Sequence, residues 1–164
     1  MSSRIISVVR WVILAPVIAV LAVVLLPFIF LLFVGRFLGH LWYVGRLRAS
    51  WPSGKFVLIA YTESELWAPY IENILLPQIA EHCVVVNRSR ESWKRQFRAE
   101  RGALSFWGGW RSYNPLAVVL RPWGRVRVFR LYESFKHLKH GQSSPLEEAV
   151  AQLVRCVRDT AAHG

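Results

Sequence analysis

The sequence predicts an α/β protein in which an N-terminal transmembrane helix precedes a domain with the element order β-α-β-α-β-β-α. Three observations support this prediction. A long apolar stretch, residues 11–34, contains no charged residue. Two short runs that are apolar on both faces, residues 56–61 and 83–86, flank a stretch with helical periodicity. Further along, two strand-like runs stand on either side of a Pro-Trp-Gly turn, which is typical of a β-hairpin.

Residues 11–34 are long enough to cross a membrane as a helix. At about 1.5 Å per residue they extend about 36 Å, more than the roughly 30 Å of a bilayer's hydrocarbon core. A core helix of this length would have a polar face, and a signal peptide would have a shorter apolar run that ends at small residues. Pro16 and Pro27 are expected to kink the helix, and a re-entrant hairpin is the alternative. We therefore expect a single-pass membrane protein anchored by residues 1–36.

Residues 37–54 are expected to form an interfacial segment and a linker. Trp42 and Tyr43 have rings that settle at the depth of lipid headgroups, and nearby arginines can reach the membrane surface. The turn-forming residues at 50–54 then predict a short linker. Residues 55–164 remain for the α/β domain, which is enough for one ordinary domain.

The distribution of positive charge predicts the orientation of the span. Two arginines precede it, and four basic residues follow it within about 20 positions: Arg36, Arg46, Arg48 and Lys55. Because cytoplasmic flanks carry the excess of Lys and Arg, we expect the C-terminal domain in the cytoplasm. Arg10, directly before the apolar run, also suits the opposite orientation, so both remain open.

The net charge of the chain is +11, which indicates a polyanionic neighbour. For a domain tethered to a bilayer, the simplest such neighbour is a surface of anionic lipid headgroups. Nucleic acid is the other polyanion to consider.

The first part of the domain is expected to form a β-α-β unit. The runs at 56–61 and 83–86 predict parallel strands, and residues 62–82 predict the helix between them in a right-handed crossover. Thr62 and Glu65 have the spacing of a capping box at the helix start. Pro77 is expected to kink the helix.

Residues 89–106 predict a second helix that is strongly basic, docked by Trp93 and Phe97 and ended by a glycine-rich turn at 106–110. Six basic residues on or beside it form a candidate surface for anions: Arg88, Arg90, Lys94, Arg95, Arg98 and Arg101. The same residues also fit a helix face that is simply solvated.

The last part of the chain predicts a hairpin and a closing helix. Residues 115–121 and 125–132 form the hairpin, and the three arginines of the second arm fit either a protected sheet edge or a basic ribbon. Residues 133–140 are expected to be a short helical or loop connection. Ser144 and Glu147 have capping-box spacing around a proline. Four residues are expected to share the apolar face of the closing helix: Leu146, Val150, Leu153 and Val157.

Residues with catalytic or ligand-binding chemistry are sparse in this sequence. The two cysteines, Cys83 and Cys156, have apolar neighbours and no ligand-like spacing, so they fit core positions and indicate no disulfide framework. His82, His137 and His140 have no metal-ligand company. We therefore predict no catalytic residue, no cofactor and no metal.

The order of elements resembles the thioredoxin-like fold. The resemblance rests on residues 56–62, on the proline-containing helix expected after them, and on Asn114-Pro115 at the start of the hairpin. It implies a cis-proline before the third strand. It also implies a C-x-x-C at the start of the first helix, but residues 63–67 read Glu-Ser-Glu-Leu-Trp. Because disulfide exchange needs a thiolate, thioredoxin-type redox activity is not expected.

The resemblance leaves three functional hypotheses. The leading one is a non-catalytic interaction or assembly module at the membrane surface, held near anionic lipid by its basic residues, with an unknown protein partner. The second is a membrane-bound enzyme such as a glutathione-using transferase, with a site near residues 62–65 and Pro115 in which Ser64 donates a hydrogen bond to a thiolate. The third is a module that binds nucleic acid or anionic lipid.

A Rossmann-like sheet is the competing fold, although no G-x-G-x-x-G or P-loop follows either strand.

Overall fold

The computed structural model describes residues 2–109 and 114–163, with side chains described from residue 20 onward. The chain divides into two compact units, Met1–His40 and Leu41–Gly164, which are treated separately below.

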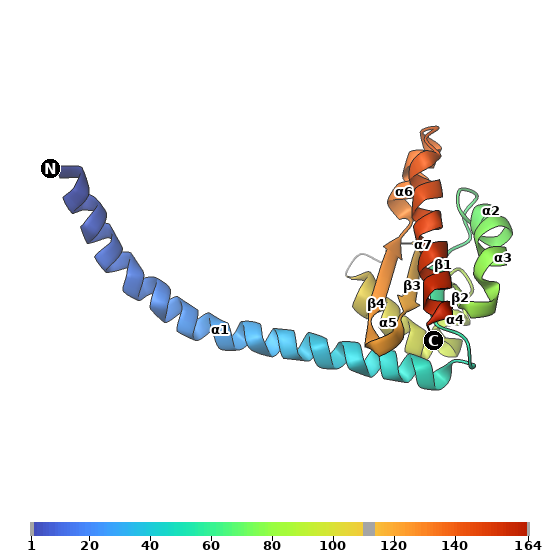
Figure 1. Ribbon diagram of the computed structural model, residues 1–164, viewed down its shortest axis with the longest axis horizontal. Coiled ribbons are helices and arrows are strands. Elements are labelled where there is room, and N and C mark those ends of the chain that lie inside the picture. Colours follow the sequence, from blue (N-terminus) through green and yellow to red (C-terminus); the bar gives the residue numbers. More distant parts are fainter. Residues whose placement is uncertain (1, 110–113, 164) are drawn as a thin grey trace. The chain divides into compact units, whose positions relative to one another are not determined.

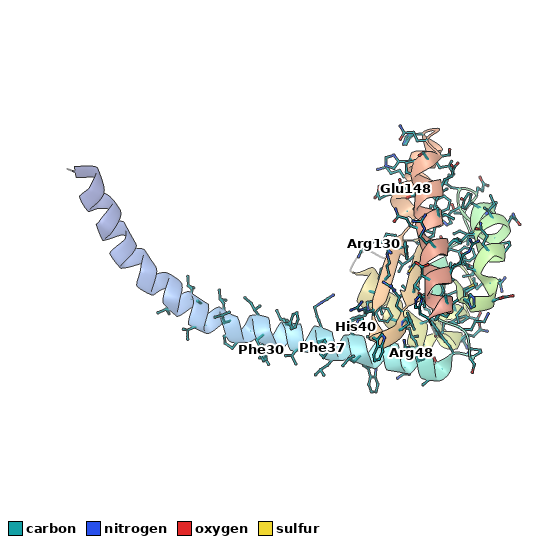
Figure 2. The ribbon with its side chains drawn as sticks, in the orientation of Figure 1. Phe30, Phe37, His40, Arg48, Arg130 and Glu148 are labelled. Carbon is teal, nitrogen blue, oxygen red and sulfur yellow. The ribbon has the colours of Figure 1, made fainter. Side chains whose placement is uncertain are left out.

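The first unit consists of the greater part of one long helix. Helix α1 runs from Ser2 to Ser50 and passes through Pro16 and Pro27 without interruption. Between Val20 and Phe33 its large apolar side chains are exposed, and Phe30, for example, keeps 65% of its surface accessible (Figure 2). Within the described residues, Val20–Ser50 is the one helix that is long and apolar enough to cross a membrane.

The last turns of α1 belong to the second unit and pack against its sheet. Val44 and Leu47 are buried there together with Trp51, whereas Leu41 and Trp42 face outward. The region expected to be an interfacial segment is therefore helical as far as Ser50 and contributes to the core of the domain. Within the linker expected at 50–54, Ser50 is the last residue of α1 and Trp51 is buried, whereas Pro52, Ser53 and Gly54 are exposed.

The second unit is a mixed α/β domain built on a four-stranded sheet with the order β2-β1-β3-β4 (Figure 1). Strands β1 (Val57–Tyr61) and β2 (Cys83–Asn87) are parallel, with Ile59 opposite Val85. Strand β3 (Leu116–Leu120) is antiparallel to both β1 and β4 (Val126–Arg130). The parallel pair, the hairpin and the edge position of the arginine-rich strand are confirmed.

Both faces of the sheet are covered, which explains why the central strands are apolar without alternation. On one face Ile59 and Ala117 contact a core that includes the closing helix. On the other face Leu58 and Val118 contact a core that includes the end of α1 and the helices after β2. Successive residues of a strand point to opposite faces, so each strand serves both cores.

The helix predicted at 62–82 begins later and is less regular than expected. It consists of α2 (Ala68–Tyr70), a π-helical turn (Ile71–Leu75), α3 (Leu76–Ile79) and a 3₁₀ turn (Ala80–His82). The predicted capping box of Thr62 and Glu65 is wrong, because the N-cap position is Trp67 and no side chain caps it. Pro77 lies in the first turn of α3, where its missing N–H is tolerated, directly after the wide turn.

The basic helix predicted at 89–106 is divided into two. Residues 89–92 form a turn, α4 spans Trp93–Gln96, and α5 spans Arg98–Gly108. The prediction of a single helix was wrong, because Phe97, between α4 and α5, has a non-helical backbone with φ −113° and ψ 56°. Gly109 follows with φ +80°, which favours glycine, and Trp110 of the predicted glycine-rich turn lies outside the described residues.

Two helices close the domain. The first is α6 (Tyr132–Lys139), in the predicted connection, and the second is α7 (Ser144–Ala162). The predicted capping box at Ser144 is wrong, because the N-cap position is Ser143 and only its backbone carbonyl is used, by the N–H groups of Leu146 and Glu147. The four residues predicted to form the apolar face of this helix are all buried, which confirms that prediction.

Candidate functional site

Three loops meet at the edge of the sheet where β1 and β2 end and β3 begins. They are the segment after Tyr61, the turn after Asn87 and the residues Asn114 and Pro115 before β3. The peptide bond between Asn114 and Pro115 is cis. In open α/β sheets, ligands commonly bind outside the carboxyl ends of parallel strands. This edge of the sheet is therefore the candidate position for a functional site.

Asn114 joins the loop before β3 to the end of β1. Its amide lies 2.8 Å from Thr62 Oγ1. In the amide orientation that satisfies every polar group, the side-chain oxygen accepts from the hydroxyl of Thr62 and, at 3.0 Å, from its backbone N–H. The side-chain nitrogen then donates to the carbonyl of Ala60 at 3.0 Å. Thr62 is thus held by a tertiary contact and does not cap a helix.

Glu63 joins the loop after β1 to the turn after β2. Its backbone N–H donates to Ser89 Oγ at 2.8 Å, and its carboxylate accepts from Asn87 Nδ2 at 3.0 Å. Asn87 Oδ1 in turn accepts from the N–H of Ser89 at 3.0 Å. The polar groups at this edge bond to one another and hold the two loops together.

Ser64, the candidate residue of the glutathione-transferase hypothesis, for which a plain helix-start serine was the favoured alternative, lies in a turn and not at a helix start. Its hydroxyl oxygen accepts a 3.3 Å hydrogen bond from the N–H of Leu66. The indole of Trp67 donates to the carbonyl of Thr62 at 2.9 Å and closes the same turn. Ser64 is not among the residues that line the four cavities described here.

Tyr61 is the last residue of β1, and it is buried in the core that includes α7. Its hydroxyl donates to the carboxylate of Glu72 at 2.7 Å. Burial, followed by this hydrogen bond and the charge of Glu72, raises the pKa of Tyr61 to about 12. The phenol stays neutral at physiological pH and acts as a fixed donor.

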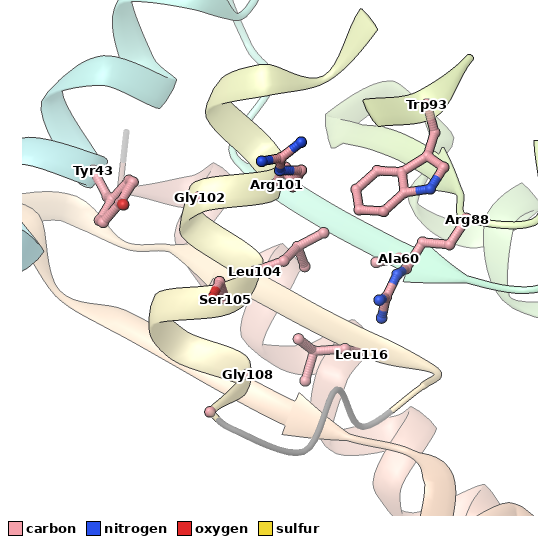
Figure 3. A pocket seen from close by; sticks show the side chains of 11 residues that line it. Tyr43, Ala60, Arg88, Trp93, Arg101, Gly102, Leu104, Ser105, Gly108 and Leu116 are labelled. Carbon is pink, nitrogen blue, oxygen red and sulfur yellow. The ribbon is translucent and has the colours of Figure 1, made fainter. Parts of the chain in front are cut away.

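A cavity of about 410 Å³ lies beside this edge, between the sheet and α5 (Figure 3). The cations in its wall are Arg88, from the turn after β2, and Arg101, from α5. In Figure 3 the side chain of Arg88 extends past Trp93 toward the space between Ala60 and Leu116. Its guanidinium carbon lies 5.3 Å from the centre of the Trp93 ring, within the range of a cation–π contact. Partial burial lowers the pKa of Arg88 from its usual value.

Only two of the six basic residues predicted as an anion-binding surface line this cavity. Arg88 is half-buried and Arg101 is exposed, and they come from different elements. Four others are exposed on the turn, α4 and α5 and do not contribute to the wall: Arg90, Lys94, Arg95 and Arg98. Sequence reasoning missed that Arg88 pairs with Trp93, although Trp93 was identified as a docking residue.

A second cavity, of about 560 Å³, lies at the opposite end of the sheet, beside Phe56 and Leu120. Trp123 is at its rim and is 96% exposed. Its φ of +60° is unusual for a residue with a side chain. The sequence marks this position only as part of a turn.

The cysteines and histidines form no reactive group in the described structure. Cys83 and Cys156 are both buried, in the core beneath α7, and neither is in a disulfide. Burial raises the pKa of the Cys83 thiol, which disfavours the reactive thiolate. Within the described residues, no three His, Cys, Asp or Glu side chains are arranged to hold a metal ion.

Comparison with known proteins adds no assignment. No protein-family model, no curated protein and no solved structure matches this chain.

Proposed function

We propose that this chain is a single-pass membrane protein that presents a redox-inactive, thioredoxin-like domain as an interaction or assembly module at the cytoplasmic surface. The strand order β2-β1-β3-β4, with one parallel and two antiparallel pairings, supports the fold resemblance. So does the cis Asn114–Pro115 bond before β3, which is the position that the resemblance implies.

The observation that carries the non-catalytic role is the state of the polar groups at the carboxyl edge of the sheet. Asn114 bonds to Thr62, and Glu63, Asn87 and Ser89 bond to one another, which is typical of structural contacts between loops. Where the family places its redox cysteines, the chain has none, and its two thiols are in the core. An edge with no cysteine, whose described polar side chains are already bonded within the fold, is better suited to binding than to group transfer.

The anchoring role is supported by α1. Its described apolar side chains between Val20 and Phe33 are exposed to a degree that only a lipid environment or another protein would make favourable. The exposed arginines that follow the apolar run, such as Arg36, Arg46 and Arg48, favour a cytoplasmic domain.

Co-purification from gently solubilised membranes tests the interaction role. The full chain is compared with a version in which an unrelated transmembrane helix replaces residues 11–34, and with a matched control that joins the native residues 1–40 to an unrelated domain. We expect the same stable partners with the first two proteins and none with the control.

Two results would count against the proposal. If partners follow the native helix into the control and leave the exchanged version, recognition belongs to the anchor. If nothing co-purifies with any of the three, the domain has no stable protein partner.

A further inference from the structure

We propose that the cavity between Arg88 and Arg101 binds a phosphate-bearing ligand. This inference goes beyond the interaction role, because it concerns a concave site on the domain and needs no protein partner.

The electrostatics of the wall favour an anion. Among the described residues, those that line the cavity include two arginines and no aspartate or glutamate. Within the described part of the chain, the guanidinium of Arg88 makes no ion pair and no hydrogen bond, and its one described contact is with the ring of Trp93. Half-burial removes part of the hydration of this cation, and the ring of Trp93 offers no hydrogen-bond acceptor in its place. A bound anion would supply the missing partner.

The guanidinium of Arg88 is positioned before any ligand arrives. Trp93 is buried at 8% exposure, so its ring is a fixed surface against which the guanidinium of Arg88 lies at 5.3 Å. This contact leaves the N–H groups at the guanidinium edge free to donate to an oxyanion, with little loss of side-chain freedom on binding. Arginine is suited to phosphate because its planar donors match pairs of phosphate oxygens.

The shape of the cavity indicates a ligand larger than a free inorganic ion. Its volume of about 410 Å³ falls within the usual range for small-molecule sites. Apolar side chains, including Leu104 and Leu116, form part of the wall and can contact an organic body attached to the phosphate. A Cβ on Gly102 would lie 2.7 Å from Tyr43 Cε1, so glycine at this position leaves room for the ring of Tyr43, which forms part of the wall.

Such a phosphate could belong to a soluble ester or to a lipid headgroup, and two arms of one experiment separate these sources. In the first arm, the purified full chain in a neutral detergent is titrated with glycerol 3-phosphate. In the second, the full chain is reconstituted in nanodiscs of phosphatidylcholine with and without phosphatidic acid. The midpoint of thermal unfolding is measured in both, because a ligand that binds the folded state raises it.

Four proteins are compared: the native chain, Arg88→Gln, Ser105→Phe and Arg98→Gln. Arg88→Gln removes the half-buried charge. Ser105→Phe fills the cavity from an exposed position on α5 without changing charge, so it tests the site even if Arg88→Gln fails to fold. Arg98→Gln is the matched control, because it removes an exposed charge from the same helix outside the cavity wall.

We expect saturable stabilisation of the native chain and of Arg98→Gln in at least one arm. Binding should weaken about tenfold or more in Arg88→Gln, the size expected for a lost charge-assisted hydrogen bond, and should weaken in Ser105→Phe. A response only to the soluble ester identifies a soluble ligand, and a response only to phosphatidic acid identifies a headgroup. Equal losses in Arg88→Gln and Arg98→Gln, full binding by Ser105→Phe, or no stabilisation in either arm would overturn the proposal.

Discussion

Leu47→Ala tests whether the end of α1 is part of the domain core. Leu47 has no exposed surface and lies in the core formed by one face of the sheet, together with Leu58 and Val118. Truncating a fully buried leucine costs about 2–5 kcal/mol, through lost burial and the cavity that remains. A value of about 3 kcal/mol would remove much of the stability of a typical domain, which is about 5–15 kcal/mol.

The effect can be measured as a shift in the urea midpoint. With a slope of about 1.5 kcal/mol per M, a loss of about 3 kcal/mol lowers the midpoint by about 2 M. The assay is equilibrium unfolding of the full chain in neutral detergent, followed by near-UV circular dichroism, which reports the packing of the aromatic residues in the domain.

Leu41→Ala is the matched control for this prediction. Leu41 lies on the same helix but is 47% exposed, so its truncation should change the free energy of unfolding by less than about 1 kcal/mol. If the two variants unfold at the same urea concentration, the last turns of α1 do not pack against the sheet, and our description of this core is wrong.

Three further predictions follow. Trp51→Phe removes the donor of a buried 2.8 Å hydrogen bond to the carboxylate of Glu100, and should lower the free energy of unfolding by about 1–3 kcal/mol in the same urea assay. Because the pKa of Tyr61 is about 12 when folded and about 10 when unfolded, its contribution to stability is complete below pH 10 and is lost as the pH rises toward 12. Glu72→Gln should reduce this loss, as measured by unfolding midpoints across that pH range. Both cysteines should react with a maleimide reagent far more slowly in the native chain than in urea, because both are buried; equal rates would contradict their core positions.

The fold could be predicted where the signal is local and strong. Unbroken apolar runs marked the central parallel strands, because both faces of the sheet are covered. The Pro-Trp-Gly turn marked the hairpin, and apolar spacing marked the buried face of α7. Each of these signals lies within the element that it predicts, so no knowledge of tertiary contacts is needed to find it.

The errors came from tertiary contacts that local patterns do not contain. The capping box at Thr62 did not form, because its hydroxyl is bonded to Asn114, 52 positions along the chain. The single basic helix did not form, because Phe97 breaks it between α4 and α5. The interfacial segment was predicted from Trp42, Tyr43 and the nearby arginines, and it stays a prediction. Its sequence did not indicate that Val44 and Leu47 pack against the sheet.

The candidate site was only partly accessible to sequence reasoning. Arg88 and Arg101 were both among the six predicted basic residues, but nothing in their spacing distinguishes them from the other four. Their position at one cavity depends on the turn after β2, on the start of α5, and on Trp93 as the ring that holds Arg88. These features are properties of the folded domain and not of a motif.

The most direct test of the central claim, that this domain is permanently anchored in a membrane, is the intact mass of the protein after alkaline carbonate extraction of the membranes that contain it. If α1 is the uncleaved span that we propose, the protein stays in the membrane pellet and its mass includes the apolar residues 11–34. A protein released into the supernatant, or one shortened by the loss of its N-terminal apolar residues, would contradict the account, since the domain would then be free of the membrane.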